Sequence, residues 1–434
     1  MIRQMQRREF LKRGSVSALG VAALSGLAWS GAAGTPNGRL RVGVIGCNNR
    51  GMDHISAWLG VANVEIAYIC DVDSRALAKG VLAVSKKQGT RPRGVADLRK
   101  VLDDPEVDAV SLAIPDHWHA PATILACAAG KHVYVEKPGS HNGRESEWMV
   151  AAARKHRRLV QMGNQRRSWP WVIEAIAALH AGELGQVRFA RGWYTNHRPS
   201  IGRGQATPVP DWLDYSLWQG PAPERPFHDN ILHYHWHWFW NWGTGELGNN
   251  GVHALDLARW GLQVDVPRRV TCGGNRYHFQ DDWETPDVYI ASFDFGEKGM
   301  AWEGRSCDPR GFEGASFGTT FFGEQGSMTI AGSSAKLFDL KDQLLREIKG
   351  GQADLFAFDS LHFANFAEAI RAGKPLRAEI EDGQKSTLLC HLGNIAWRTG
   401  HTLNFDPQAR AIVDDPAASA LWQREYRPGW KPVV

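Results

Sequence analysis

The stretch Arg41-Val-Gly-Val-Ile-Gly-Cys-Asn-Asn-Arg-Gly51 decides the fold of this chain. The apolar run Leu40 to Ile45 predicts a buried parallel strand, and Gly46 and Gly51 frame a tight turn into a helix that we expect to begin near Met52. Backbone N–H groups at such a helix start, with the positive end of the helix dipole, attract a pyrophosphate. The stretch therefore predicts the opening turn of a dinucleotide-binding βαβ unit.

The next predicted strand, Val64 to Cys70, ends in a carboxylate, Asp71. An acid at this place accepts hydrogen bonds from an adenosine ribose diol and repels a 2′-phosphate, so it favours NAD over NADP. Asn48 replaces the middle glycine of the usual G-x-G-x-x-G pattern; because Asn tolerates a positive φ, we expect the turn to survive with its backbone further from the phosphates. An ordinary βαβ turn with a surface aspartate is the alternative. The predicted cofactor contacts here are Gly46, Asn48, Asn49, Arg50 and Asp71.

The first 33 residues have the composition of a targeting segment rather than of a folded domain. Arg7-Arg8-Glu-Phe-Leu-Lys12 is a twin-arginine pattern, followed by the modestly apolar run Ser15 to Trp29 and by small residues suited to cleavage. The run is too short and too rich in Gly and Ser for a spanning helix, so we expect no membrane anchor in the mature protein. The segment predicts the twin-arginine export machinery as a partner and a periplasmic or secreted location; a basic disordered leader is the alternative.

Removing this segment changes the charge balance of the chain. It holds five of the 50 basic residues and one of the 46 acidic residues, which leaves 45 of each. A formally neutral chain gives no reason to expect binding to nucleic acid or to an anionic membrane. None of the six cysteines lies in a C-x-x-C pair, so we predict no cysteine-based metal site or redox motif.

Helices and strands continue to alternate up to about residue 162, which predicts a parallel-sheet Rossmann domain over residues 34–162. Two predicted strands, Ala109 to Ile114 and His132 to Val135, lead into polar segments that we expect to be loops. Ligands of an open parallel sheet collect at the carboxyl ends of its strands. We therefore expect further cofactor contacts from Asp116, His117, His119, Glu136 and Lys137.

The composition shifts after about residue 163, where aromatic residues become dense. Strand-like runs separated by Gly-rich turns predict a mostly antiparallel sheet, so residues 163–434 form a predicted α+β domain. The strand-like runs are Gln186 to Trp193, Val270 to Cys272, Val288 to Phe295, Met300 to Glu303 and Thr319 to Phe322.

Together these features resemble the glucose–fructose oxidoreductase / inositol dehydrogenase / MocA (Gfo/Idh/MocA) family. The resemblance rests on the Gly46 turn, Asp71, the Glu136-Lys137-Pro138 signature and Gly248-Asn-Asn-Gly-Val-His253-Ala-Leu-Asp256, and the stretch Gln161 to Ser168 is similar to an exported branch. It covers nearly the whole chain after the leader. It implies NAD(P) binding, a six-stranded C-terminal sheet, a homo-oligomer, and oxidoreductase chemistry on a sugar, polyol or glycoside hydroxyl.

Oxidising a carbinol requires a base for the hydroxyl proton and a cation near the developing alkoxide. Lys137 suits the cation role, with a solvated lysine beside a turn as the alternative. By the family pattern His253 suits the acid–base role, with a satisfied core histidine as the alternative. Much of the family has Asp four residues before this histidine, whereas this chain has Asn249, which carries no charge. Asp256, three residues after His253, either orients the imidazole or has a structural role.

Three histidines, His233, His235 and His237, alternate and would share one face of a strand, where they could hold zinc. The interpretation that we favour is a pocket wall that hydrogen-bonds and stacks on sugar, so we predict no metal. By family analogy, several residues are expected to face the substrate, although a basic patch for phosphate is an alternative for the arginines. The expected substrate residues are Gln165, Arg166, Asn196, Arg198, Trp236, His237 and Asn249.

Three functions are compatible with the sequence. The first is a nicotinamide-dependent sugar oxidoreductase with a tightly bound cofactor. The second is a redox-assisted glycosidase, which oxidises C3, eliminates the C1 group, adds water and reduces the sugar again, regenerating NAD⁺. The third is a non-catalytic sugar-binding protein with a vestigial nucleotide site, which the presence of Lys137 and His253 disfavours.

Overall fold

The computed structural model describes residues 38–351 and 355–434, so the predicted leader, residues 1–33, lies outside the described residues. A six-stranded, all-parallel sheet forms the first half of the fold, in the order β3-β2-β1-β4-β5-β6 of a doubly wound nucleotide-binding domain. Its strands are β1 (Leu40–Ile45), β2 (Val64–Cys70), β3 (Arg93–Val95), β4 (Ala109–Leu112), β5 (His132–Val135) and β6 (Val160–Met162).

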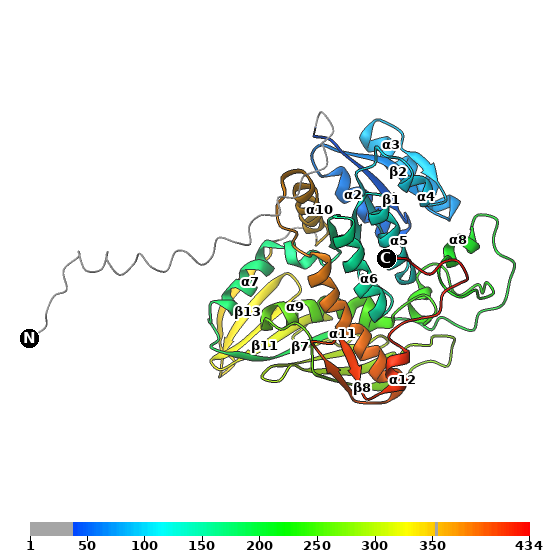
Figure 1. Ribbon diagram of the computed structural model, residues 1–434. Helices are drawn as coiled ribbons and strands as arrows, with labels where there is room; N and C mark the ends of the chain where they lie inside the picture. Colours follow the sequence, from blue (N-terminus) through cyan, green and yellow to red (C-terminus); the bar gives the residue numbers. More distant parts are fainter. Residues whose placement is uncertain (1–37, 352–354) are drawn as a thin grey trace, which may run out of the picture.

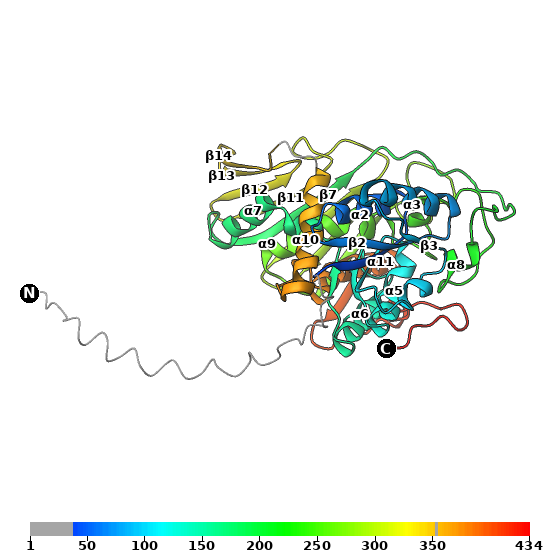
Figure 2. The same ribbon diagram turned by 90° about the horizontal axis from the view of Figure 1, so that it is seen from above.

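The helices of this domain cover the sheet, as Figures 1 and 2 show. Two of them correct the sequence-based expectations. Helix α2 starts at Asn49 rather than near Met52, and α5 starts at Asp116, so the predicted loop after β4 is a helical turn. The helices are α2 (Asn49–Leu59), α3 (Ser74–Gln88), α4 (Arg99–Leu102), α5 (Asp116–Ala128) and α6 (Gly143–Lys155).

A larger sheet forms the second half, and all its strand pairs are antiparallel except β7 with β10. The mostly antiparallel character was predicted, but the sheet has ten strands rather than six, in the order β14-β13-β12-β11-β7-β10-β9-β8-β15-β16. The strands are β7 (Val187–Thr195), β8 (Arg269–Asn275), β9 (Val288–Asp294), β10 (Gly299–Arg305), β11 (Phe317–Gly323), β12 (Gly326–Ala331), β13 (Ser334–Asp339), β14 (Leu344–Lys349), β15 (Leu403–Asp406) and β16 (Ala411–Val413).

Helices of this half cover one face of the sheet and connect it to the first domain (Figure 1). Helix α10 returns to the first domain, where Phe363 stacks on Tyr134 at 4.2 Å between ring centroids. The helices are η1 (Gln165–Ser168), α7 (Pro170–His180), α8 (Tyr215–Gln219), η2 (His235–Trp238), the π-helix η3 (Leu247–Gly251), α9 (Val252–Leu262), α10 (Leu355–Ala372), α11 (Ile380–Thr399) and α12 (Pro416–Ala420).

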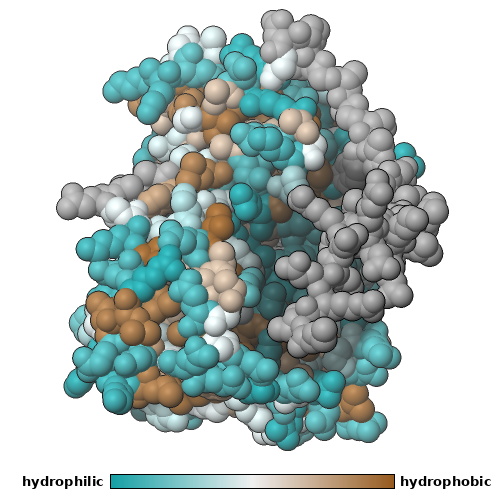
Figure 3. All heavy atoms as spheres, turned by 90° about the vertical axis from the view of Figure 1, so that its left-hand side faces the viewer, coloured by the Kyte–Doolittle hydropathy of each residue, from teal (hydrophilic) through white to brown (hydrophobic). Residues whose placement is uncertain are grey.

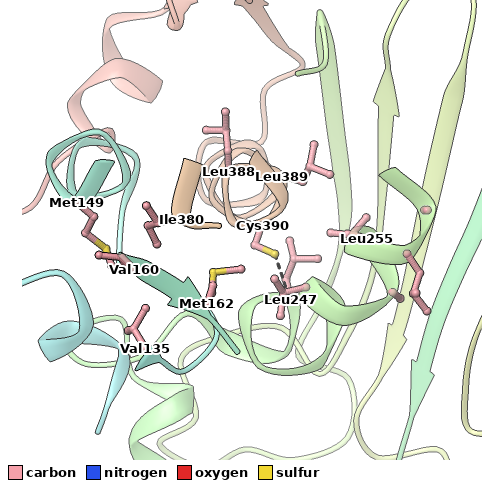
Figure 4. Packing of buried hydrophobic residues seen from close by; sticks show 14 of the residues in the cluster. Val135, Met149, Val160, Met162, Leu247, Leu255, Ile380, Leu388, Leu389 and Cys390 are labelled. Carbon is pink, nitrogen blue, oxygen red and sulfur yellow. Dashed lines mark hydrogen bonds between the residues drawn. The ribbon is translucent and has the colours of Figure 1, made fainter. Parts of the chain in front are cut away.

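Helix α11 joins the two halves through a shared apolar core. Figure 4 shows its residues Leu388, Leu389 and Cys390 between Met162 of β6 on one side and Leu255 of α9 on the other. The Cys390 thiol also donates a hydrogen bond to the carbonyl oxygen of Leu247, 3.2 Å away. Because side chains in a close-packed interior leave little room for movement, α11 fixes β5 and β6 relative to η3 and α9.

The molecular surface turned toward the left of Figure 1 is largely hydrophilic, with separate hydrophobic patches (Figure 3). Among the residues that the structure describes, no helix is both long enough and apolar enough to cross a membrane.

Candidate functional site

In the turn between β1 and α2, the backbone at Gly46 lies close to that of Ala113, and the backbone at Gly51 lies close to that of Gly46. Gly46 has φ 84°, and a Cβ atom there would collide with the carbonyl oxygen of Ala113; a Cβ atom on Gly51 would collide with the carbonyl oxygen of Gly46. Only glycine fits these two positions. Asn48 has φ −72°, so the positive φ that we expected of it is not needed, and its side chain makes no capping hydrogen bond to the helix. The first N–H groups of α2 thus have no side-chain cap, as a phosphate site requires.

Asp71 lies beside this turn at the end of β2. Its carboxylate accepts hydrogen bonds from the backbone N–H groups of Cys47 at 2.6 Å and Asp73 at 2.8 Å. Burial raises the pKa of Asp71, and these two N–H groups oppose that shift. A ribose diol placed here would meet a positioned acceptor, so the residues of the turn and the strand end fit the adenosine ribose and pyrophosphate of a dinucleotide.

A cleft of about 680 Å³ runs along the carboxyl edge of the parallel sheet and contains most of the predicted site. Its volume lies within the range of small-molecule and cofactor sites. Residues from both halves of the chain line it. The predicted residues among them are Gly46, Asn48, Asn49, Arg50, Asp71, Asp116, His119, Glu136, Lys137, Gln165, Trp236, His237, Asn249 and His253.

Some predicted site residues lie elsewhere. His117 is turned away from the cleft, with Nε2 3.0 Å from the carbonyl oxygen of Trp218. Asn196 donates to the Tyr194 hydroxyl, and Arg198 pairs with the buried Glu246 at 2.8 Å. Arg166 lies over the Phe317 ring, 4.2 Å from its centroid. These four side chains are not among the residues that line this cleft, and their contacts with cofactor or substrate stay predictions.

Glu136 anchors the Glu-Lys-Pro signature inside the first domain. It is buried and receives the Arg50 Nε–H at 2.8 Å and the His54 Nε2 at 3.0 Å. Helix α10 contributes Asp359, which accepts from Arg50 Nη1 at 2.8 Å. Despite the burial of Glu136, Arg50 and His54 hold its pKa well below the usual range. The network fixes the strand end from which Lys137 projects.

Lys137 reaches across the cleft to the second half of the chain. Its Nζ donates to the Asn249 carbonyl oxygen at 2.8 Å and to Asn249 Oδ1 at 3.2 Å. Burial lowers the pKa of Lys137, while the carboxylate of Glu136 opposes the shift. The Asn249 amide is in turn oriented by Glu246, whose Oε1 accepts from Asn249 Nδ2 at 3.2 Å. Lys137 is therefore positioned by neutral oxygens of residue 249 rather than by a carboxylate.

His253 lies on the first turn of α9, on the wall that also carries Asn249. Within the described part of the chain, its ring has no hydrogen-bond partner in the protein, whereas His54 and His119 are both bonded. Burial and the positive charges of Arg166 and Lys137 lower the pKa of His253 well below its usual range. The imidazole is therefore neutral near pH 7 and has a free acceptor for a proton.

Asp256 does not orient His253. Its carboxylate accepts from Arg167 Nε and Nη2 and from the Ser386 hydroxyl, at distances between 2.7 and 3.1 Å. The side chain is buried beneath α9 and does not line the cleft. Of the two roles that the sequence left open, this geometry corresponds to the structural one.

The three alternating histidines do not share a strand face. Residues 235–238 form the 3₁₀ helix η2, and each imidazole has a different partner: His233 bonds Asp73, His235 the carbonyl oxygen of Asn230, and His237 that of Tyr234. The Trp236 and His237 rings stack at 3.6 Å between centroids and form part of the cleft wall. The alternating histidines therefore wrongly suggested a strand here, although His233 and His237 do lie at a wall of the cleft.

Several residues that line the cleft were not predicted from the sequence. Tyr234 stands in the cleft with its hydroxyl 3.3 Å from Asn249 Nδ2, and its φ of 89° is rare for a residue other than glycine. Leu217, Trp218 and Trp430 come from segments far from the motifs. The dense aromatic composition after residue 163 was the one available hint.

The chain matches known proteins along both halves. Residues 40–164 match the model described as "Oxidoreductase family, NAD-binding Rossmann fold", and residues 193–282 and 323–432 match "Oxidoreductase family, C-terminal alpha/beta domain". A glycosyl hydrolase family 109 protein of Saccharopolyspora erythraea is 33% identical over 160 residues, 36% of this chain and 35% of that protein. Levoglucosan dehydrogenase of Pseudarthrobacter phenanthrenivorans is 31% identical over 171 residues, 38% and 35% of the two chains.

These curated relatives are each matched over little more than a third of their own length. Among solved structures, levoglucosan dehydrogenase in complex with NADH and L-sorbose superposes with a TM-score of 0.66 at 19% identity, covering 84% of this chain and 98% of that one. Aldose-aldose oxidoreductase from Caulobacter crescentus gives 0.65 at 19% identity, covering 85% and 100%. Together the two family models match well over half of the residues, so this chain belongs to the Gfo/Idh/MocA oxidoreductase family, and its first domain is the NAD-binding Rossmann fold of that family.

Proposed function

We propose that this protein is an NAD-dependent oxidoreductase that acts on a hydroxyl-bearing carbon of a sugar, polyol or glycoside. One observation carries the proposal: Lys137 and His253, whose ring has no partner among the described residues, lie in the same cleft as the dinucleotide turn, although they come from different domains. A cation and a neutral imidazole beside a nicotinamide site are the groups that carbinol oxidation requires.

The two side chains divide the work. His253, neutral near pH 7, accepts the hydroxyl proton of the substrate, and Lys137 Nζ, held by Asn249, stabilises the developing alkoxide oxygen. Bound NAD⁺ supplies the hydride acceptor. The Trp236–His237 stack gives the apolar sugar face a flat wall, because aromatic rings pack well against such faces.

The substrate is tested with the purified protein and a panel of sugars, polyols and aryl glycosides. A carbinol that changes the absorbance of the bound nicotinamide supports the oxidoreductase. Cleavage of an aryl glycoside without net NADH would instead favour the redox-neutral glycosidase, to which the glycosyl hydrolase family 109 relative draws attention. Sugar binding with no chemistry on any member would leave only the non-catalytic alternative.

We further propose that the protein is exported by the twin-arginine machinery with its cofactor already bound. The Arg7-Arg8 pattern supports this, since that route carries folded proteins. Free NAD(H) is scarce outside the cytoplasm, so a dissociating cofactor would not be recycled there. The net reaction is then redox-neutral, or a second substrate reoxidises the bound cofactor.

Protein purified from the periplasm should carry close to one equivalent of nicotinamide and turn over without added NAD⁺. The measurement is mass spectrometry of the denatured protein's small-molecule fraction. A variant with both Arg7→Lys and Arg8→Lys should remain in the cytoplasm and serves as the control. Protein that arrives empty and releases NADH in each cycle would contradict this proposal.

We expect NAD⁺ to bind at least about tenfold more tightly than NADP⁺. Asp71 would lie against a 2′-phosphate, and Arg75, a nearby cation that could offset it, is bound by Asp73 at 3.0 Å and stacked over Trp212 at 3.4 Å. Titration of the apoprotein with both dinucleotides measures the ratio. Equal or tighter binding of NADP⁺ would show that Asp71 does not select the ribose.

A further inference from the structure

A segment of the second domain crosses the open end of the nucleotide site. We call residues 209–242 the strap; it contains α8 and η2. In Figures 1 and 2, α8 and the long loops around it lie beside the first domain rather than over the large sheet. Backbone hydrogen bonds join the strap to the end of β2: Ser74 N–H donates to the Trp212 oxygen at 2.9 Å, and Asp214 N–H to the Val72 oxygen at 3.0 Å.

Side chains reinforce this junction. Asp73 and Arg75 of the first domain meet Trp212 and His233 of the strap, and we call these four residues the latch. His233 Nε2 is 2.9 Å from Asp73 Oδ2, and the Arg75 guanidinium lies 3.4 Å from the centroid of the Trp212 ring. Asp73 is only 3% exposed. The Asp73 carboxylate is buried although Arg75 is exposed, so the charged contact from His233 to Asp73 makes this a specific junction.

A second junction holds the strap at α5. The carbonyl oxygen of Trp218 accepts from Trp118 Nε1 at 3.0 Å and bonds His117 Nε2 at 3.0 Å. The backbone N–H of His117 also donates to the carbonyl oxygen of Trp242 at 3.1 Å. The strap is therefore fixed at two places, at the end of β2 and at the first turn of α5.

Between the two junctions the strap faces the cleft. Leu217 and Trp218 form one wall, and Val72 and Leu98 of the first domain form another. Trp430, from the end of the chain, closes the same region; its ring makes an edge contact with Trp118 at 5.5 Å. This largely apolar and aromatic chamber lies next to Asp71, which Val72 follows in the chain, and a flat aromatic base fits such walls.

We propose that the strap, closed by the latch, encloses the adenosine half of NAD and makes the cofactor resident. This inference rests on the proposed NAD-dependent function and deepens it. The bound dinucleotide cannot leave past Trp218 and Trp430 unless the strap separates from β2. Opening the latch therefore controls the dissociation rate of the cofactor and has little influence on the nicotinamide end of the cleft.

The test is a pulse–chase of bound cofactor. Protein loaded with adenine-labelled NAD⁺ is chased with excess unlabelled NAD⁺, and retained label is followed by rapid gel filtration. The variant with both Trp212→Ala and His233→Ala should release label at least about tenfold faster than the unmodified protein, because changes to a binding site act mostly on dissociation. Trp240→Ala is the matched control: this strap residue stacks on Trp397, away from the cleft, and should release at the unmodified rate.

Nicotinamide mononucleotide, which lacks the adenosine half, separates the latch from general damage. Its affinity should be the same in the double variant and in the unmodified protein. Label release as slow as in the unmodified protein, or an equal loss of mononucleotide affinity, would overturn the proposal. Trp430→Ala, on the opposite wall, should also speed release and decides the question if the double variant does not fold. These experiments do not depend on sugar turnover. The proposed reaction and the proposed role of the strap can therefore fail independently of each other.

Discussion

Replacing Lys137 or His253 by alanine is expected to lower turnover by about 10²-fold or more, the usual contribution of a positioned acid–base group. Lys137 is the cation beside the reacting oxygen, and His253 is the cleft histidine whose ring has no partner among the described residues. Each variant should keep its fold and its bound NAD, because neither side chain belongs to the turn between β1 and α2, to the end of β2 at Asp71, or to the hydrogen-bond network of Glu136.

Steady-state rates on the substrate found in the panel, together with bound nicotinamide per protein, measure both parts. Two surface substitutions are the matched controls: Lys155→Ala on α6 and His180→Ala on α7, both exposed. They should leave the rate unchanged. Unmodified rates in both Lys137→Ala and His253→Ala would place the chemistry elsewhere in the cleft.

Asp256→Ala should lower the free energy of unfolding by about 1–3 kcal/mol, the usual cost of leaving buried hydrogen-bonding groups without their partner. The Arg167 guanidinium, 8% exposed, would keep its pair with Asp382 but lose the carboxylate to which Nε and Nη2 donate. Chemical denaturation with urea gives the difference. The remaining folded protein should lose less turnover than His253→Ala, since Asp256 does not line the cleft.

Asp265→Ala is the control for this prediction. Its carboxylate also pairs with basic side chains, Arg259 and Lys385, but it is 64% exposed. An exposed pair contributes less than about 1 kcal/mol. If Asp256→Ala is no more destabilised than Asp265→Ala, the buried cluster is not what holds α9. A rate loss as large as that of His253→Ala would instead restore the orienting role.

Local patterns were enough for the nucleotide domain. The bounds of β1 and β2 agree with the predicted strands, because each is a short apolar run buried between helices. Lys137 and His253 were predicted from two separate motifs and are 116 positions apart in the sequence, yet they line one cleft. The carboxyl ends of the parallel strands and the first turn of α9 explain that convergence, although their chemical roles stay predictions.

Long-range contacts explain what the sequence did not reveal. Asp256 was compared with His253 on its own helix, but its partner Arg167 is 89 positions away. The alternation of His233, His235 and His237 suggested a strand, whereas stacking of neighbouring rings and separate carbonyl partners produce η2. Nothing local in residues 209–242 indicates that they cross to β2. The resemblance implied six strands in the second sheet, and the short pair β15 and β16 at its end was not among the strands expected from the sequence.

The position of α11 has a consequence for modularity. The chain is divided by sequence into a nucleotide half and a substrate half, yet the inner surfaces of both halves close on the same helix, with Met162 on one side and Leu255 on the other (Figure 4). Neither half has a complete core of its own at this seam. A recombinant chimaera that exchanged the first domain for one from another family member would therefore need matching side chains on α11 as well, so the two halves are not interchangeable parts.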